Sequence, residues 1–203
     1  MSDPFVERAL RHLRGHLSGV LRFGEHVRPL KVVVAPDGRL VAPVMVAMTQ
    51  SFDTVLSLPD DNDESLHVQV TLEPFEERGP FGHLADRWRM YHGEPPDVRW
   101  ALMAIDAARF EEQFLDGIGL QRPNPLAGDE ARLCKAINGR RDDLRRACER
   151  TIARRLDEPV LVGVDPLGFD VRGAFEIFRL DADPPIPDGA TAMRLFETMA
   201  ADR

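Results

Sequence analysis

The densest group of interaction-prone side chains in the sequence lies between residues 87 and 92. Arg87, Trp88, Arg89, Tyr91 and His92 fall in a stretch, residues 83–92, whose pattern predicts a helix. An indole beside guanidinium groups can stack on a flat ring or contact a phosphate. The same aromatic side chains can instead pack the helix against a sheet. Arg87 and Trp88 are candidate cofactor-binding residues, and the packing alternative stays open.

Two other groups have the residue types of metal sites. Asp60, Asp61, Asp63 and Glu64 form an acidic run of oxygen ligands, and His12 and His16 share one face of a predicted helix. A solvated turn that keeps a sheet edge from pairing accounts for the acidic run more simply than a calcium site does. The histidine pair has no third ligand close to it in the sequence. We therefore predict no metal site.

The motifs of the common enzyme classes are missing from the sequence. It contains no GxGxxG, GxxxxGK[ST], GxSxG or HExxH pattern. Cys134 and Cys148 are the only cysteines, and their spacing fits neither a metal site nor a redox pair. The catalytic residues remain unassigned, and enzymatic activity stays an open question.

The element that must position these residues is a hairpin within Lys31–Met48. Two β-branched or apolar runs, 32–34 and 40–48, flank Pro36-Asp37-Gly38, which are favoured turn residues. The second run is apolar at almost every position, so both of its faces should be covered. A small closed barrel covers one face, and a helix or a second subunit covers the other. We expect a homodimer on this ground.

The remaining elements complete a fold of the α+β class. We predict a helix at 5–21, strands at 54–58, 66–72, 98–105 and 110–120, and the helix at 83–92. A break at residues 122–125, rich in proline, separates a split-barrel domain, 1–122, from a smaller C-terminal α/β domain, 123–203. The second domain should contain a helix interrupted at Asn138-Gly139, strands at 160–164, 169–172 and 176–180, and a last helix capped by Asp188.

Composition and charge restrict the partners. The net charge of −8 argues against nucleic acid or an anionic membrane as the main partner. No apolar run approaches the roughly 20 residues that span a bilayer. The first ten residues lack the basic-then-apolar order of a secretory signal, so we expect a cytoplasmic protein.

Two segments carry a resemblance to known proteins. APDGRLVAPV, residues 35–44, resembles the pyridoxamine 5′-phosphate oxidase-like, FMN-binding split-barrel superfamily. Residues 162–172, VGVDPLGFDVR, with Arg179-Leu180 and Pro184-Pro185, resemble the α/β domain appended to split barrels in heme-utilisation proteins. Asn138 and Asp143 fall where that domain often has an Asn-x-Asp-His-x-Asp segment.

The resemblance implies a homodimer with FMN, or alternatively heme, in a cleft between subunits. It places Arg39 at the FMN phosphate, and Ser57 and Leu58 near the flavin ring. The sequence departs from the pattern of these relatives at two points. The acidic run 60–64 replaces a helix that holds the phosphate in many relatives, and carboxylates repel a phosphate dianion. No histidine follows His92, so the C-terminal domain cannot supply a heme ligand, and the candidates are His26, His67, His83 and His92.

Three hypotheses follow. The first is an FMN-binding oxidoreductase, in which Arg39 and Arg87 bind the phosphate at a distance from the acidic run. The second is a heme-binding or heme-degrading protein. The third is a binding module that keeps the fold without a cofactor, since fold does not fix function.

Overall fold

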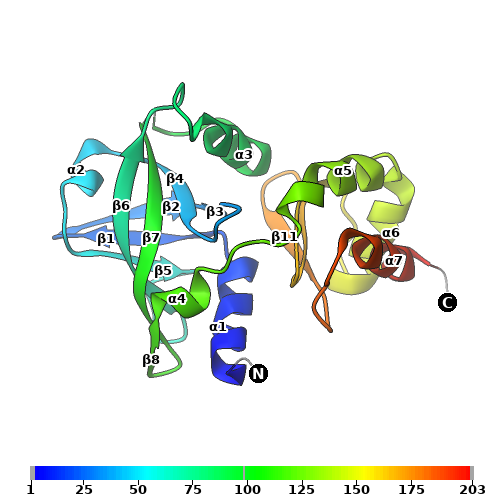
Figure 1. Ribbon diagram of the computed structural model, residues 1–203, viewed down its shortest axis with the longest axis horizontal. Coiled ribbons are helices and arrows are strands. Elements are labelled where there is room, and N and C mark those ends of the chain that lie inside the picture. The colour runs from blue at the N-terminus through cyan, green and yellow to red at the C-terminus, as the bar shows by residue number, and fades with distance from the viewer. Residues whose placement is uncertain (1–2, 98, 202–203) are drawn as a thin grey trace. The chain divides into compact units, whose positions relative to one another are not determined.

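One curled, half-barrel sheet of antiparallel strands organises the first part of the chain (Figure 1). The computed structural model describes residues 3–97 and 99–201, and the chain divides into two units, 1–123 and 124–203. The strands of the first sheet are ordered β2-β1-β5-β6-β7-β4-β3, and β8 pairs with β7. Their bounds are β1 Ser18–Phe23, β2 His26–Lys31, β3 Val33–Val34, β4 Leu40–Val44, β5 Thr54–Leu58, β6 Leu66–Phe75, β7 Arg99–Phe110 and β8 Gln113–Asp116. Val98, where one strand was predicted to begin, lies outside the described residues.

The predicted hairpin is confirmed as β3 and β4, with Val34 opposite Leu40. Gly38 has a φ of +91°, which an L side chain rarely adopts. A Cβ at Gly38 would also come within 2.7 Å of the backbone of Arg122, so the turn packs tightly against that segment. The turn chemistry and the close approach both require glycine.

The second arm of this hairpin ends earlier than predicted. β4 stops at Val44, and a short helix, α2, follows at Val46–Thr49. Every residue of β4 is buried within the chain itself. The burial of this strand therefore does not require a second subunit.

The predicted helix at 5–21 is also wrong in its second half. The helix, α1, spans Pro4–Gly15, and the chain then enters β1. A Cβ at Gly19 would lie 2.1 Å from the carbonyl oxygen of Ser57, because β1 packs closely on β5 there. Pairing with two strands outweighs the helical periodicity of residues 16–21.

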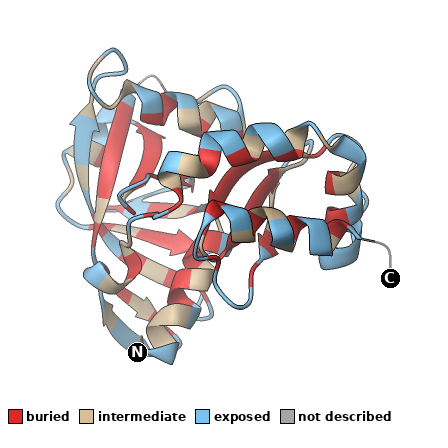
Figure 2. Cartoon of the chain, turned by 45° about the vertical axis from the view of Figure 1, so that its right-hand side comes forward, coloured by how far each residue is buried: buried red, intermediate tan, exposed pale blue. Residues whose placement is uncertain are grey.

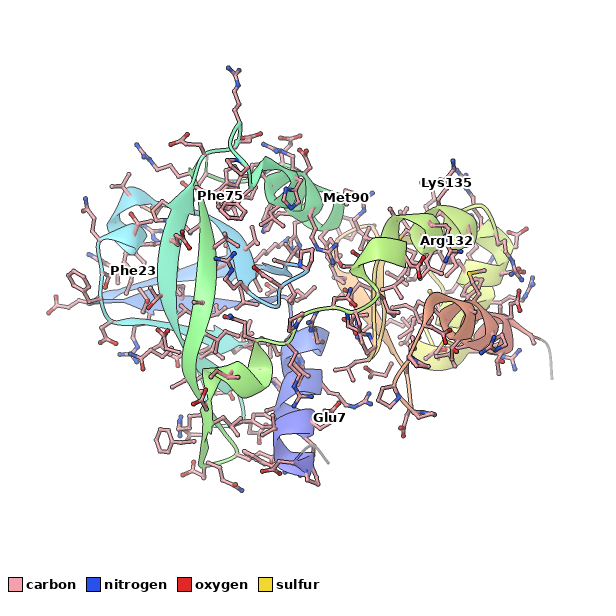
Figure 3. The ribbon with its side chains drawn as sticks, viewed as in Figure 1. Glu7, Phe23, Phe75, Met90, Arg132 and Lys135 are labelled. Carbon is pink, nitrogen blue, oxygen red and sulfur yellow. The ribbon has the colours of Figure 1, made fainter. Side chains whose placement is uncertain are left out.

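Helix α3, Gly82–His92, forms as predicted and packs on the β3–β4 side of the sheet. Its inward residues Trp88 and Tyr91 are almost fully buried. Phe75, at the end of β6, lies beside α3 in Figure 3 and stacks on Trp100 of β7 with a centroid distance of 6.3 Å. A last short helix of this unit, α4, covers Gly117–Leu120.

The second unit is a three-stranded antiparallel sheet with three helices. Its strands, in the order β11-β10-β9, are β9 Val160–Asp165, β10 Gly168–Arg172 and β11 Ile177–Asp181. The helices are α5 Ala127–Asn138, α6 Arg141–Ile152 and α7 Gly189–Ala200, so the predicted interruption at 138–139 and the predicted last helix are confirmed. Asp188 caps α7 by accepting a hydrogen bond from the Thr191 amide. The buried faces of these helices, red in Figure 2, share one apolar core with the sheet.

A buried ionic group lies on the face of this sheet opposite the core. Phe169, Val171 and Leu180 belong to the core, and side chains alternate along a strand, so Asp170 and Arg179 face the other way. Arg179 Nη2 lies 2.5 Å from an Asp165 carboxylate oxygen and Nη1 lies 2.7 Å from one of Asp170. Only 7% of the Arg179 side chain is exposed. Burial alone would lower the pKa of Arg179, but the two carboxylates outweigh it and the pKa is raised.

The architecture confirms the predicted α+β class, a small split barrel followed by a smaller α/β unit. The division between the units falls inside the 122–125 break. Within the described residues, no helix is long and apolar enough to cross a membrane.

Candidate functional site

Three side chains of α3 donate hydrogen bonds to backbone carbonyls of the 31–34 segment. The donor–acceptor distance is 2.9 Å in each bond. Trp88 Nε1 donates to the carbonyl of residue 31, His92 Nε2 to that of residue 32, and Arg87 Nε to that of residue 34. A carbonyl oxygen only accepts, so His92 carries a proton on Nε2. These bonds fix α3 against the β3–β4 hairpin.

Arg87 and Trp88, both predicted to contact a cofactor, take part in this packing. Arg87 also donates to the Tyr91 hydroxyl at 3.2 Å, and its guanidinium lies over the Tyr91 ring. Trp88 is 2% exposed and meets Trp100 edge to face, with ring centroids 5.8 Å apart. The indole cannot stack on an external ring without leaving the core.

Arg39, the predicted phosphate contact, lies at the start of β4 between two carboxylates. Its Nε is 2.8 Å from Asp37 Oδ2, and its Nη1 is 3.2 Å from Glu73 Oε2. The guanidinium also lies over the Phe81 ring, 5.7 Å from its centroid. A phosphate at this position would have to displace at least one carboxylate.

Ser57 and Leu58, predicted near a flavin ring, end β5. The Ser57 hydroxyl oxygen lies 2.8 Å from His67 Nδ1 and 3.3 Å from Asp61 Oδ1, and Ser57 is 3% exposed. The Leu58 carbonyl accepts a hydrogen bond from His12 Nε2 at 2.9 Å. Burial lowers the pKa of His12, so this ring favours the neutral state.

The hydrogen bonds of His67 assign the direction of its bond to Ser57. His67 Nε2 lies 2.9 Å from the backbone carbonyl of Asn62, which can only accept. In the neutral ring the proton is therefore on Nε2, and Nδ1 accepts from the Ser57 hydroxyl. That hydroxyl has a single proton, so it cannot donate to Asp61 at the same time.

The predicted site residues form two separate groups. Arg39, Arg87 and Trp88 surround the β3–β4 hairpin, whereas Ser57 and Leu58 end β5. Ser57 is paired with His67 at one end of β6, and Arg39 contacts Glu73 near the other end. At roughly 3.3 Å per residue, the stretch of β6 between them is about 20 Å long. One chain does not bring all five residues together.

The histidines nominated as heme ligands also differ in availability. The ring nitrogens of His67 and Nε2 of His92 are hydrogen-bonded within the chain. His26 and His83 are exposed. In the part of the chain that the structure describes, no three His, Cys, Asp or Glu side chains gather as a metal site.

Sequence reasoning missed the partners of Ser57. The alternation of residues 66–72 indicated that His67 faces away from the core residues of β6. Nothing in the sequence gave the register that sets His67 opposite Ser57. The acidic run was recognised, but not the contacts of its carboxylates.

Comparisons with known proteins extend the structural description. No protein-family profile and no curated protein matches this sequence. The protein Atu2129 of unknown function from Agrobacterium tumefaciens has a similar structure, with a TM-score of 0.77 at 13% identity over 99% of this chain and 98% of its own. That likeness shows a shared fold and assigns no activity.

Two further solved structures are more distant. A heme-binding protein from Mycobacterium smegmatis has a TM-score of 0.44 at 15% identity, over 98% of this chain and 97% of its own. A putative pyridoxamine 5′-phosphate oxidase from Listeria innocua has a TM-score of 0.42 at 16% identity, over 54% of this chain and 99% of its own. At these scores neither likeness supports a functional argument.

Proposed function

We propose that this chain is a split-barrel binding module that works without a flavin anchored through its phosphate. The observation that carries this proposal is the placement of Arg39 between Asp37 and Glu73. One guanidinium and two carboxylates leave a net negative charge where the phosphate was expected. A phosphate dianion approaching this group is repelled rather than bound.

The end of β5 supports the same conclusion. The chain continues there into turns and bends at residues 59–65, with no helix whose N-terminus could receive a phosphate. The Ser57 hydroxyl is engaged with His67. Both positions that the flavin hypothesis needs are thus occupied by the chain's own groups.

An FMN-dependent oxidoreductase is the second candidate, because Arg39 and Arg87 lie at the same hairpin. In that case the two arginines would hold the phosphate, and the flavin itself would supply the hydride chemistry. For the heme alternative, the exposed His26 and His83 are the available ligands.

Absorption and titration test the proposal directly. We expect freshly purified protein to show neither flavin bands nor a Soret band, and to bind FMN no more tightly than riboflavin, which lacks the phosphate. Arg39→Ala should change neither affinity. If FMN is instead anchored at Arg39, Arg39→Ala should lose roughly 1.5–3 kcal/mol of binding free energy for FMN alone. This corresponds to an affinity about 10- to 150-fold lower.

The matched control for Arg39→Ala is Arg132→Ala, an exposed arginine of the second unit. Retention of stoichiometric flavin by the wild type, or a selective loss of FMN binding in Arg39→Ala, would refute the module and favour the oxidoreductase. A Soret band lost on His26→Ala or His83→Ala would favour the heme protein.

We further propose that the module is a cytoplasmic homodimer. Support comes from exposed apolar side chains that follow β4, namely Met45, Val46 and Phe52, the last fully exposed. Light scattering should give twice the 22.8 kDa chain mass. Phe52→Ser should shift the dimer toward monomer, whereas Phe114→Ser, a change at another exposed phenylalanine, should not. A wild-type monomer at micromolar concentration would contradict the proposal.

A further inference from the structure

The outer edge of β9 is fastened by side chains rather than by another strand. β9 is an edge strand of the three-stranded sheet, and α5 packs along it. Asn138, the last residue of α5, donates from Nδ2 to the Leu161 carbonyl at 2.9 Å. Its Oδ1 accepts from the Leu161 amide at 2.8 Å. One side-chain amide thus makes both hydrogen bonds that a neighbouring strand would make at this residue.

Two further side chains close the same edge three residues later. Glu130 Oε1 accepts from the Val164 amide at 3.0 Å, and Asn124 Nδ2 donates to the Val164 carbonyl at 2.8 Å. Both backbone groups of Leu161 and of Val164 are therefore satisfied by side chains, which protects the edge from pairing with another strand. At Val164 the two bonds come from two residues, whereas at Leu161 both depend on Asn138.

Asn138 precedes Gly139, and an Asn-Gly pair is chemically labile. The backbone nitrogen of the glycine attacks the side-chain amide carbon of the asparagine, a C–N bond forms, and ammonia leaves. The product is a five-membered succinimide, which water opens to aspartate or isoaspartate. The reaction consumes water and needs no other reagent. Glycine favours it because no Cβ hinders the approach of the nitrogen. The other two asparagines of the sequence precede Asp63 and Pro125.

The folded chain restrains both reacting groups. The Gly139 amide donates to the Lys135 carbonyl at 3.2 Å. Ring closure requires the Asn138 side chain to turn back onto this amide, and its two bonds to Leu161 oppose that rotation. Gly139 is nevertheless exposed, in the two-residue link between α5 and α6. Local opening of this link would release both groups together.

We propose that Asn138 is a deamidation site that the fold keeps closed, and that its modification permanently unfastens the outer edge of β9. An aspartate at this position can still accept from the Leu161 amide, but it has no N–H for the Leu161 carbonyl. The edge then offers an unpaired carbonyl to another strand. A molecule whose second unit has once opened is thereby marked. The inference concerns the lifetime of the folded chain and does not depend on the proposed function.

The first test follows deamidation in the full chain by peptide mass spectrometry, in mildly alkaline buffer with and without urea above the unfolding transition. We expect Asn138 to convert in urea and at least about tenfold more slowly in the folded protein, which corresponds to an opening free energy of about 1.4 kcal/mol or more. Asn124 is the internal control, because the nitrogen of Pro125 has no proton to lose.

Gly139→Ala is the matched variant for this test. A Cβ at Gly139 would lie 3.3 Å from the Ala136 carbonyl oxygen, so a small shift accommodates it and Asn138 keeps its bonds. The added methyl group should slow the conversion in urea severalfold, because it hinders the attacking nitrogen. Urea unfolding curves show whether the variant keeps the fold.

The second test uses Asn138→Asp, which reproduces one product. It should lower the thermal unfolding midpoint of the second unit by roughly 5–15 °C, because a hydrogen bond is lost and a carbonyl is left unpaired. Asn62→Asp is the control, since Oδ1 of Asn62 only accepts, from the Glu64 amide and the Ser65 hydroxyl, and a carboxylate accepts equally well.

Three results would each overturn the inference. They are equal conversion rates at Asn138 in the folded and unfolded chain, no conversion at Asn138 in urea, and an Asn138→Asp protein as stable as Asn62→Asp. The first would show that the contacts with Leu161 and Lys135 do not restrain the site, and the last that β9 does not need the amide.

Discussion

Replacing Arg179 by methionine should lower the free energy of unfolding of the second unit by about 3–5 kcal/mol. Asp165 and Asp170, which both pair with the guanidinium, are almost fully buried. Without Arg179 the two carboxylates lose the guanidinium that both contact, and they have little access to water. Urea unfolding followed by circular dichroism measures the loss.

Two comparisons show whether charge causes this effect. Arg132→Met changes an exposed arginine of α5, labelled in Figure 3, whose ion pair with Asp129 is on the surface. This substitution should lower the free energy of unfolding by less than about 1 kcal/mol. Combining Arg179→Met with Asp165→Asn and Asp170→Asn should recover most of the stability, because no buried charge remains unpaired. If Arg179→Met behaves like Arg132→Met, the buried ion pairs contribute little to the fold.

The second large effect is expected at Trp88. Trp88→Ala should destabilise the barrel unit by about 3–5 kcal/mol, since it empties a buried aromatic site between α3 and β7. Trp88→Phe keeps most of the packing and loses the hydrogen bond to the Lys31 carbonyl. We therefore expect the free energy of unfolding to fall by about 1 kcal/mol. Thermal unfolding measures both.

His83→Ala is the control, because His83 is exposed on the same helix. It should change stability by no more than about 0.5 kcal/mol. A stable Trp88→Ala protein that had lost a bound ligand would show instead that Trp88 is a binding residue, as one interpretation of the sequence suggested.

Elements with a local chemical signal were predictable from the sequence. The hairpin around Gly38, the break after Asn138 and the cap at Asp188 each depend on residues adjacent in the chain. β1 was not predictable in the same way. Leu17, Val20 and Leu21 fit a helical stripe, but Gly19, Leu21 and Phe23 also alternate as buried strand positions. Pairing with distant strands decides between the two patterns.

The candidate site was less predictable than the fold. Arg39 was correctly placed at the start of the second hairpin strand, but its contact with Glu73 joins segments far apart in the sequence. The side-by-side placement of Ser57, His67 and Arg109 depends on the register of three strands. A shift of one residue would send His67 to the other face, and no local signal fixes that choice.

The hydrogen bonds from α3 to the 31–34 segment affect how copies of this chain can associate. β3 is an edge strand of its sheet, where free carbonyls would offer a template for another chain, and α3 already binds the Val34 carbonyl of this strand and the Val32 carbonyl just before it. At the opposite end, β2 contains Pro29, which has no N–H to donate, beside Arg28. These two edge strands thus resist strand-by-strand aggregation. Detaching α3 would expose the edge of β3 and create a point where misassembly can begin.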